Sequence, residues 1–394
     1  MKILVLNAGS SSLKFQLLNM EDESVIAKGN AERIGIEGSF LTYKANGKAY
    51  TNKYLMPTHV EAMEHIIATL TDPEIGVIKK ITEISGFGHR VVNVGETYFD
   101  SVVVTPEVLE DFKTKVDFSP LHVPGAISGI EACYKIAPKI KNVAVFDIGF
   151  HKTLPDYAYR YALPKEDYEE LKIRKYGAHG TSHRFVSQEC AKLLGEVEGT
   201  KIVTCHLGSG SSMCAVKDGK SVDTSMGFTP LEGLVMGTRT GDIDASVVNF
   251  IAEKRNMTAK EVVNYLNKKS GMFGLCGYSD MRDVEANLET NADCKLAYDV
   301  MCYRVIKYIG SYAAAMGGLD AIVFTGGIGE RDPQVRETVL SSLKFLGVEF
   351  DAEKNPSVFG DFGELSTENS KVKVYVIPTN EELVIARETK DLIK

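Results

Sequence analysis

One short motif occurs twice in the chain, and this repeat constrains the fold more than any other feature. The first copy, residues 2–15, reads K-I-L-V-L-N-A-G-S-S-S-L-K-F, and the second begins at Lys201 as K-I-V-T-C-H-L-G-S-G-S-S-M-C-A-V. Aligning the first lysines also aligns Gly9 with Gly208. Each copy reads as an apolar strand, a Gly/Ser turn and a second strand, which is typical of a β-hairpin. Because each copy opens one half of the chain, we interpret the repeat as a duplicated domain.

The two turns are also chemically suited to an anion. Their side chains are small, so backbone N–H groups and hydroxyls can approach a ligand closely. A single Gly/Ser turn usually only reverses the chain. Two copies in a duplicated architecture favour the hypothesis that a phosphate binds between the two halves.

Bulk composition narrows the class of protein. A chain of 394 residues predicts two or three domains, and 44% hydrophobic with 25% charged residues is ordinary for a globular protein. The net charge of −8 and the lack of a basic run argue against nucleic acid or an anionic membrane as partner. No apolar run reaches the roughly 18 residues that span a bilayer. Seven scattered cysteines without a C-x-x-C pair predict the cytoplasm and disfavour a zinc or disulfide framework.

Hydrophobic periodicity predicts alternating strands and helices. After the first hairpin we expect a strand (24–34), a helix (59–71), a strand (86–92), a helix from Pro106 with Thr105 as N-cap, a helix (124–136) and a strand (142–146). The second half should contain a helix capped by Ser182 and ending at Leu194, the second hairpin with a third strand (220–225), and helices at 243–254, 258–269 and 292–316. A strand (320–324), a Gly-rich turn (325–330) before another helix, a strand (372–377) and a C-terminal helix should follow. This order predicts an α/β protein with mixed sheets.

Polar residues stand where predicted strands end, and in open α/β sheets that edge binds ligands. They are Asn7, Arg90, Asp147, His206 and Glu381. Arg90 and Arg239 could bind phosphoryl or carboxylate oxygens, although a salt bridge explains most single arginines. Asp147 and Glu381 could ligate Mg²⁺, or they could cap helices.

Other motifs are weaker or absent. His179 lies between Gly177 and Gly180 and could meet a transferring phosphoryl group, but an isolated histidine is more often structural. The chain contains no G-x-x-x-x-G-K-[ST] sequence, so it is not a P-loop protein. The G-G-I-G-E turn lacks the full G-x-G-x-x-G spacing of a dinucleotide site.

At these residues the chain resembles the acetate kinase family of the acetate and sugar kinase/Hsp70/actin superfamily. The resemblance covers the whole chain and rests on motifs spread from residue 4 to residue 387. They are L-N-A-G-S-S-S-L-K, G-H-R-V-V, P-L-H, F-D-x-x-F-H, Y-G-x-H-G-T-S-H, H-L-G-x-G, T-P-L-E-G-L-x-M-G-T-R-x-G-D-I-D, F-T-x-G-I-G-E and P-T-N-E-E-L-x-I-A-R.

The resemblance implies an α/β fold of two duplicated ribonuclease H-like (actin-like ATPase) domains with a cleft between them. The first would span 1–150 plus the C-terminal helix 386–394, and the second 151–385. It also implies acetate kinase activity, which is reversible phosphoryl transfer from ATP to acetate, giving acetyl phosphate and ADP. Mg²⁺ would be the cofactor, with Mn²⁺ as a substitute. A homodimer is implied as well.

Carried over by position, the family's catalytic roles fall on Arg90, Asp147, His179, Arg239 and His122. The two arginines would hold the carboxylate and the transferring phosphoryl group. His179 would stabilise its equatorial oxygens, with His122 helping to position them. Asp147 and Glu381 would orient Mg²⁺, with Asn7 at the phosphates and the metal.

The resemblance also assigns binding residues. The acyl methyl would contact Val92, Leu121, Ala178 and Pro230. Asp280, Met281 and Arg282 would border the adenosine. The remaining nucleotide-binding residues would be Ser10, Ser12, Lys14, His206, Gly208, Ser209, Gly210, Gly326, Gly327, Ile328, Gly329, Glu330 and Arg331.

The sequence departs from the family pattern around the acyl pocket. Asn93-Val94-Gly95 replaces His-Gly-Gly, Val123-Pro124-Gly125-Ala126 replaces Asn-Pro-Ala-Asn, and Ile148-Gly149 replaces Thr-Ala. Ala178 stands where the family has Phe, and Ser209 and Arg331 replace two Asn residues. Loss of an aromatic ring at position 178 predicts a larger pocket, in which propionate or a longer acid would match or surpass acetate. If neighbouring side chains fill the space, acetate would remain the best substrate.

Three alternatives to acetate kinase therefore stay open: a kinase of propionate or butyrate, a non-catalytic nucleotide-binding relative, and a sugar kinase of the same superfamily. A sugar kinase should use a catalytic Asp base on a hydroxyl group, and the two-arginine pattern argues against it.

Overall fold

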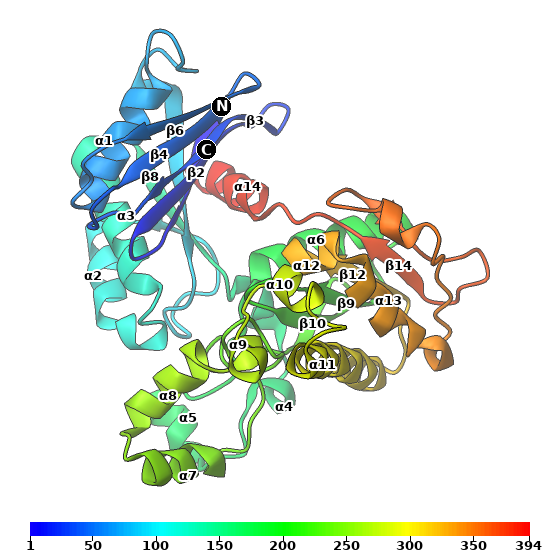
Figure 1. The fold of residues 1–394 in the computed structure, drawn as a ribbon. Coiled ribbons are helices and arrows are strands. Elements are labelled where there is room, and N and C mark those ends of the chain that lie inside the picture. Colours follow the sequence, from blue (N-terminus) through cyan, green and yellow to red (C-terminus); the bar gives the residue numbers. More distant parts are fainter. The chain divides into compact units, whose positions relative to one another are not determined.

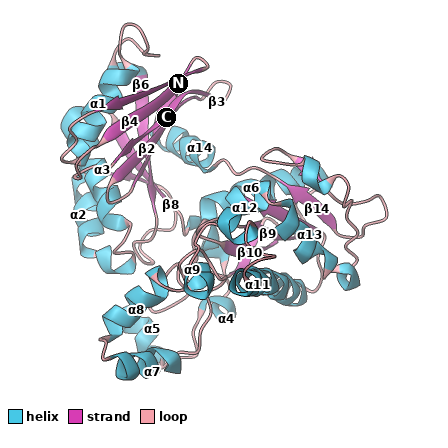
Figure 2. Cartoon of the chain, viewed as in Figure 1, coloured by secondary structure: helices cyan, strands magenta, loops and turns pink.

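The computed structural model describes residues 1–394, which form two compact units (Figure 1). The first unit comprises 1–149 and 380–394, and the second comprises 150–379. Residues 380–385, which the sequence analysis placed in the second half, lie with the first unit because helix α14 (Glu381–Ile393) is continuous through them. Each unit is an α/β structure built on one mixed sheet (Figure 2).

The sheet of the first unit has eight strands in the order β5-β4-β3-β2-β1-β6-β8-β7. Their bounds are β1 (Lys2–Ala8), β2 (Ser12–Asn19), β3 (Ser24–Glu32), β4 (Phe40–Ala45), β5 (Lys48–Lys53), β6 (Ile84–Val91), β7 (Val102–Val104) and β8 (Lys141–Phe146). The helices are α1 (His59–Leu70), α2 (Pro106–Thr114), α3 (Val123–Ile136) and α14, with short 3₁₀ turns at Ile81–Glu83 and Val116–Phe118. Helices α1 and α3 pack together on the sheet, and α14 contacts β1, β6 and β8.

Glycines in β6 allow α14 to approach the sheet closely. A Cβ at Gly86 would lie 2.6 Å from Ile393 Cδ1, and a Cβ at Gly88 would lie 2.4 Å from Thr389 Oγ1. Such distances are shorter than van der Waals contact, so a side chain at either position would force side chains of α14 to shift. The close packing sets the N-terminus of α14 beside the end of β6, where Arg90 is located.

The sheet of the second unit has six strands in the order β11-β10-β9-β12-β14-β13. They are β9 (Lys201–His206), β10 (Ser212–Lys217), β11 (Lys220–Thr224), β12 (Ala321–Thr325), β13 (Gly363–Glu364) and β14 (Lys373–Val376). The α-helices are α4 (Asp156–Tyr159), α5 (Lys165–Leu171), α6 (Gly180–Leu194), α7 (Ser246–Arg255), α8 (Ala259–Lys268), α9 (Gly271–Cys276), α10 (Met281–Glu285), α11 (Ala292–Met316), α12 (Gly326–Arg331) and α13 (Pro333–Ser341). Short 3₁₀ turns cover Gly149–Thr153, Lys344–Leu346 and Asn355–Ser357.

The core of the second unit lies on both faces of this sheet. On one face, Met301, Val305 and Ile309 of α11 pack against strands β9 and β10. On the other face, Val186 and Cys190 of α6 pack against Ile202 and its neighbours. Burial of apolar side chains on both faces is what holds such a layered structure together.

The two sheets share a five-strand core with the same connectivity. In the first unit, β1 pairs antiparallel with β2 and parallel with β6, while β3 extends β2 and β8 extends β6. In the second unit, β9 pairs antiparallel with β10 and parallel with β12, while β11 extends β10 and β14 extends β12. This agreement confirms the predicted α/β fold with a duplicated core.

Most predicted elements exist, with small shifts at their ends. Thr105 caps α2 by accepting a hydrogen bond from Val108 N, as expected. Two predictions were wrong. The residue at the N-cap of α6 is His179 rather than Ser182, because the helix begins at Gly180. The expected Gly-rich turn at 325–330 is largely helix α12, which begins directly after β12.

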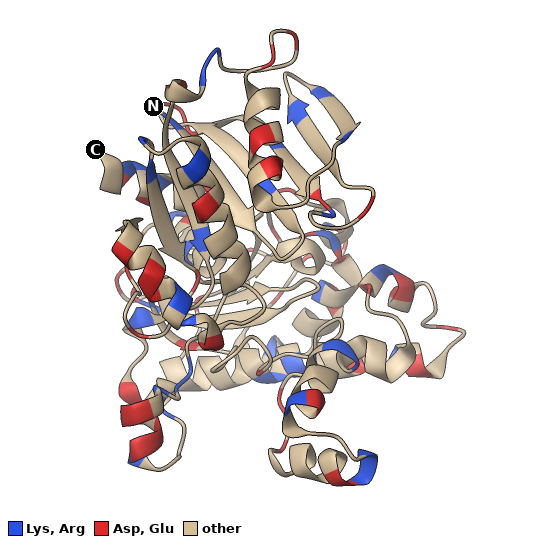
Figure 3. Cartoon of the chain, turned by 90° about the vertical axis from the view of Figure 1, so that its left-hand side faces the viewer, with Lys and Arg blue, Asp and Glu red and all other residues tan.

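Charged residues are interspersed over both units (Figure 3). All seven cysteines are free thiols. No helix is long and apolar enough to cross a membrane.

Candidate active site

In the first unit, Arg90 and Asp147 form a buried ion pair. Arg90 lies near the end of β6, and Asp147 directly follows the neighbouring strand β8, where its N–H donates to Val91 O (2.8 Å). Arg90 Nη2 donates to Asp147 Oδ2 at 2.7 Å, and the side chain of Asp147 is fully buried. Burial alone would lower the pKa of Arg90, but the charges of Asp147 and Glu381 more than offset it and raise that pKa. Arg90 is therefore a fixed cation.

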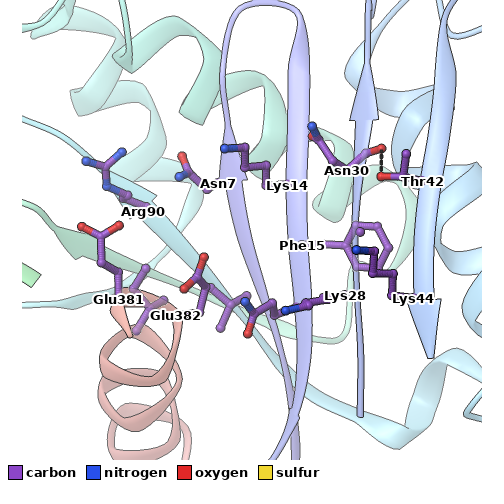
Figure 4. Close-up of a pocket in the computed structure, with 14 residues that line it drawn as sticks. Asn7, Lys14, Phe15, Lys28, Asn30, Thr42, Lys44, Arg90, Glu381 and Glu382 are labelled. Carbon is purple, nitrogen blue, oxygen red and sulfur yellow. Dashed lines mark hydrogen bonds between the residues drawn. The ribbon is translucent and has the colours of Figure 1, made fainter. Parts of the chain in front are cut away.

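A cavity beside this pair collects further predicted residues (Figure 4). It is lined by Asn7 and Lys14, which face each other across β1 and β2, and by Arg90 and Glu381. Glu381 occupies the first turn of α14, and its Oε1 atom is buried without a hydrogen-bond partner. The Nε atom of Arg90 is likewise without a partner. The structure thus brings Asn7, Arg90, Asp147 and Glu381 together, as predicted.

These residues fit a magnesium site that is completed by substrate. The unpartnered Glu381 oxygen and the Asn7 amide are the oxygen donors that Mg²⁺ prefers. No group of three His, Cys, Asp or Glu side chains could hold a metal ion by itself. Mg²⁺ usually keeps several waters and binds through one or two carboxylates together with substrate phosphates, so a sparse set of protein ligands is compatible with it.

The other predicted residues of the first unit lie around the N-terminus of α3. His122 is the N-cap residue, and its Nδ1 lies 3.4 Å from Ser119 Oγ. Val92 is buried, whereas Leu121 is 56% exposed. The first Gly/Ser turn contacts the same helix, because a Cβ at Gly125 would lie 2.8 Å from the backbone of Gly9. The need for this close contact explains glycine at position 125, one of the departures from the family pattern.

In the second unit, His179 is held in an uncommon backbone conformation. It is the N-cap of α6 with a φ of 54°, in the left-handed region. The preceding Gly177 has a φ of 82°, and a Cβ there would lie 2.5 Å from the His151 ring. A bulky residue with positive φ stores strain that the surrounding structure must balance, and such residues occur often at functional sites.

A hydrogen-bonded network fixes the His179 ring. Its Nδ1 lies 2.8 Å from Ser212 Oγ, which lies 2.7 Å from His183 Nε2. The other ring nitrogen of His183 reaches Thr204 Oγ1 (2.8 Å). The ring of His179 also stacks on His206, with centroids 4.2 Å apart. The contact of Nδ1 with Ser212 and the stacking on His206 together fix the orientation of the His179 ring.

His206, at the end of β9 as predicted, is anchored by hydrogen bonds in turn. Its Nδ1 lies 2.7 Å from Ser182 Oγ, and that hydroxyl also bonds Thr379 Oγ1 (2.8 Å). Ser182 therefore orients a site histidine instead of capping a helix. Sequence reasoning missed Ser212, Ser182 and His183 as positioning residues. The only available signal was their place inside the motifs G-S-S and G-T-S-H.

Arg239 lies on a loop, residues 233–242, that is shaped by glycines. Gly233 and Gly241 have positive φ angles, and Asp242 closes the loop by exchanging hydrogen bonds with Gly233. Arg239 Nη1 donates to Pro230 O (3.1 Å), and no carboxylate pairs with the guanidinium. Burial lowers the pKa of Arg239. A partly buried cation without a counter-ion is poised to bind an anion.

His179 and Arg239 converge on one point of the second Gly/Ser turn. A Cβ added at Gly210 would lie 3.7 Å from His179 Cε1 and 3.8 Å from Arg239 Nη1. The lack of a side chain at Gly210 thus leaves open space that both groups border.

Within the second Gly/Ser turn, Ser211 Oγ accepts from Gly208 N (3.1 Å), and Ser209 O accepts from Gly237 N. In the first turn, Gly9 N donates to Ser12 O (2.8 Å), while Ser10 is exposed.

The predicted acyl-pocket residue Ala178 is not on an open surface. It is buried at 3% exposure in a cluster with Met226 and Met236, which are themselves almost completely buried. Pro230 is partly exposed and supplies the carbonyl that Arg239 binds. Two flexible methionines therefore pack beside position 178.

The predicted adenosine-bordering residues begin α10. Asp280 is the N-cap and forms a two-point ion pair with Arg282, at 2.9 and 2.6 Å. The hydrogen bonds from Arg282 lower the pKa of Asp280 to about 2. Met281 is buried, whereas the Arg282 side chain is 88% exposed. Arg282 is thus available to a ligand, and Met281 belongs to the core.

Several of residues 326–331, which were predicted to bind nucleotide, make contacts that stabilise the fold. Gly326 has a φ of 77°, and a Cβ there would lie 2.7 Å from Leu207 O. Ile328 N and Gly329 N donate to the same Leu207 carbonyl, which ties α12 to the second Gly/Ser turn. The Glu330 carboxylate accepts from Gly326 N and Thr379 N, so it stabilises the helix start. Gly327 and Arg331 are exposed.

Two sheets of the same topology, each ending in fixed polar side chains, define a protein of the duplicated ribonuclease H-like class. The acetokinase family model matches residues 2–387. The chain is 54% identical to the acetate kinase of Thermoanaerobacterium thermosaccharolyticum and 53% identical to that of Thermotoga maritima, over 100% of this chain and 99% of each relative. The chain therefore belongs to the acetokinase family.

Solved structures agree with this assignment. The acetate kinase of Porphyromonas gingivalis is 43% identical with a TM-score of 0.95, and each chain is covered completely. A propionate kinase from Francisella tularensis is 41% identical with a TM-score of 0.93, over 99% of both chains.

Proposed function

We propose that this protein is an acetate kinase, which reversibly transfers a phosphoryl group from ATP to acetate and forms acetyl phosphate and ADP. The observation that carries the proposal, beside membership of the acetokinase family, is the convergence of His179 and the unpaired Arg239 beside Gly210. A cation without a counter-ion and an oriented imidazole provide a site for a phosphoryl group.

In the first unit, Arg90 would bind carboxylate or phosphoryl oxygens through its free Nε–H, while Asp147 holds the guanidinium in place. Asn7 and Glu381 would hold Mg²⁺, and His122 would help to position the phosphoryl group. Mg²⁺, when bound, neutralises negative charge on the phosphates. Mn²⁺, which accepts similar oxygen ligands, could replace it.

In the second unit, Arg239 would contact the transferring phosphoryl group. His179 would donate to its equatorial oxygens, while Ser212 keeps the ring in position. The second Gly/Ser turn, Gly208 to Gly210, would approach the nucleotide phosphates. Asp280 to Arg282 would border the adenosine, with Arg282 as the exposed contact.

The chemistry requires positioning more than covalent catalysis. A carboxylate has a pKa near 4, so acetate is already an anionic nucleophile at neutral pH and needs no strong general base. Phosphoryl transfer is accelerated mainly by aligning the reactants and stabilising charge on the transferring group. Two fixed arginines and an oriented histidine supply these effects.

Acetate is a better candidate than a larger acid. The packing of Ala178 with Met226 and Met236 in a buried cluster supports a small acyl pocket. Relatives at 51–55% identity over the full chain are named acetate kinase. A homodimer remains part of the proposal and rests on the family resemblance.

The activity can be tested by incubating the protein with Mg-ATP and a carboxylate and trapping the acyl phosphate as a hydroxamate. We expect acetyl hydroxamate to form, and kcat/KM to fall from acetate to propionate to butyrate. Absence of hydroxamate with every acid, from folded protein, would reject the kinase assignment. A higher kcat/KM for propionate would reject acetate as the preferred substrate.

A further inference from the structure

The cavity of the first unit extends well beyond the residues assigned to phosphoryl transfer. It measures about 220 Å³ and continues from Asn7 and Arg90 across the faces of β2, β3 and β4 (Figure 4). This outer part is lined by Gln16, Lys28, Asn30, Thr42 and Lys44. None of these five residues has a role in the proposed kinase reaction.

The sheet register places two lysines side by side in this outer part. Lys28 on β3 pairs with Lys44 on β4, and on its other side with Gln16 on β2. Paired residues share a face and neighbouring strands lie about 4.8 Å apart, so the two lysine side chains point the same way. Neither lysine makes a hydrogen bond or an ion pair. Like charges directly opposite each other destabilise a sheet, so the pair has no evident structural use.

Unsatisfied hydrogen-bond acceptors line the same part of the cavity. Gln16 Oε1 and Asn30 Oδ1 are buried, and neither receives a hydrogen bond. The orientation of Asn30 is fixed, because its Nδ2 donates to Glu32 Oε1 at 2.9 Å. Buried polar atoms without partners are rare in folded proteins, and here they suggest that a ligand supplies the missing donor.

The cavity also has two acidic lining residues, both on α14. Glu381 and Glu382 line the cavity from α14, whereas β2, β3 and β4 contribute the two lysines and the two amide oxygens. A ligand for this region must therefore combine negative charge, for the two lysines, with a hydrogen-bond donor, for the two amide oxygens.

We propose that Lys28, Lys44, Gln16 and Asn30 form a second anion site, which binds a phosphate group that keeps a proton. Hydrogen phosphate and phosphomonoesters with a protonated oxygen carry both the charge and the O–H donor. Sulfate carries the charge but has no donor at neutral pH. A site that leaves buried acceptors unpaired discriminates strongly against such an analogue.

Labelling of lysines tests the site without relying on activity. The protein is treated with an amine-acylating reagent, and modification of each lysine is followed by mass spectrometry. We expect inorganic phosphate to slow labelling of Lys28 and Lys44 several-fold. Lys53, which is exposed on the neighbouring strand β5, should be unaffected and serves as the control. Protection by sulfate equal to that by phosphate, or no protection by phosphate, would overturn the proposal.

Variants separate this site from the proposed kinase site. The double variant Arg90→Met/Asp147→Leu, which removes the buried ion pair without leaving an unpaired charge, should keep the phosphate protection of Lys28 and Lys44 even if turnover is lost. The double variant Lys28→Gln/Lys44→Gln should lose calorimetrically measured phosphate binding to the second site, while Lys53→Gln should retain it. Loss of protection in the folded Arg90→Met/Asp147→Leu variant would show that only the kinase site binds phosphate. Glycerol phosphate serves as a second probe, and stronger protection than by inorganic phosphate would identify a phosphomonoester as the ligand.

Discussion

The two units share a sheet topology, but their candidate site arginines have opposite electrostatic environments. Arg90 of the first unit is neutralised by the fully buried Asp147, and nearby carboxylates raise its pKa. Arg239 of the second unit has no acidic partner, and burial lowers its pKa. The same charge is thus compensated within the protein in one unit and left for a ligand in the other.

This difference indicates distinct physical roles. A buried ion pair is stable only while both partners are present, because desolvating one charge alone is expensive. Arg90 is therefore coupled to the folding of its unit. The charge of Arg239 has no acidic partner in the folded state, which supports the proposal that it serves binding and catalysis. Each prediction below tests one side of this contrast.

The largest effect on stability is expected from Asp147→Ala. The substitution leaves Arg90, whose side chain is only 16% exposed, without its counter-ion. We expect the free energy of unfolding to fall by about 3–5 kcal/mol, measured by urea denaturation. The double variant Arg90→Met/Asp147→Leu should recover most of this loss. An unchanged unfolding free energy in Asp147→Ala would mean that the pair does not stabilise the first unit.

A change at Gly210 should affect activity without affecting stability. The added methyl of Gly210→Ala would make ordinary van der Waals contacts with His179 and Arg239, at 3.7 and 3.8 Å, so the fold should tolerate it. It would, however, occupy the space that both side chains border. We expect kcat to fall on the order of 10–100-fold, because small displacements of reacting groups are costly. Wild-type turnover would place the phosphoryl group elsewhere.

Ala178→Phe should destabilise the core of the second unit. Because Ala178 is buried with Met226 and Met236, a phenyl ring would overfill the cluster and cost about 1–3 kcal/mol of unfolding free energy. The ratio of kcat/KM for acetate and propionate should change little. If the variant is as stable as the wild type and shifts strongly toward acetate, Ala178 lines the acyl pocket after all.

The units should also differ in their response to pH. In the first unit, burial lowers the pKa of His89 from its usual 6.5 to about 4, with the ring bonded to Asn142 Oδ1 (2.8 Å). The unfolded chain takes up a proton first, so this contribution to stability is complete above pH 6.5 and is lost as pH falls toward 4. His89→Gln should weaken that dependence in denaturation curves recorded between pH 4 and 7.

The second unit should show the opposite trend through Glu285. Burial and the charge of Asp332 raise the pKa of Glu285 from 4.5 to about 8. The unfolded chain loses this proton first, so stability falls as pH rises from 4.5 toward 8. Glu285→Gln should remove this decline in the same experiments. Identical pH profiles for wild type and both variants would refute the assignments.

The sequence predicted the outline of the fold because its signals are local. The hairpins follow from the apolar strands around each Gly/Ser turn, and Thr105-Pro106 marks a helix start through its own backbone chemistry. The β4–β5 hairpin was missed because β5 alternates weakly and is mostly exposed. Helix α12 was predicted as a turn because it is rich in glycine. The group that fixes its start, the Leu207 carbonyl, lies far away in sequence.

The contacts among the candidate site residues could not be predicted from the sequence. Motifs indicated Arg90, Asp147, His179 and Arg239, yet nothing local distinguishes a paired arginine from an unpaired one. The positioning role of Ser212 depends on pairing between β9 and β10 and on the start of α6, which only the folded chain brings together. The packing of Ala178 against Met226 and Met236 depends in the same way on residues that are distant in sequence.

The most direct test of this account is Arg239→Met, examined for stability and turnover in parallel. We predict that kcat for acetyl phosphate formation falls on the order of 10²–10³-fold, as expected for loss of a charged transition-state contact. The free energy of unfolding should change by no more than about 1 kcal/mol, the value of the single hydrogen bond to Pro230. A loss of several kcal/mol in unfolding free energy with kcat retained would contradict the account, because Arg239 would then serve the fold and not the reaction.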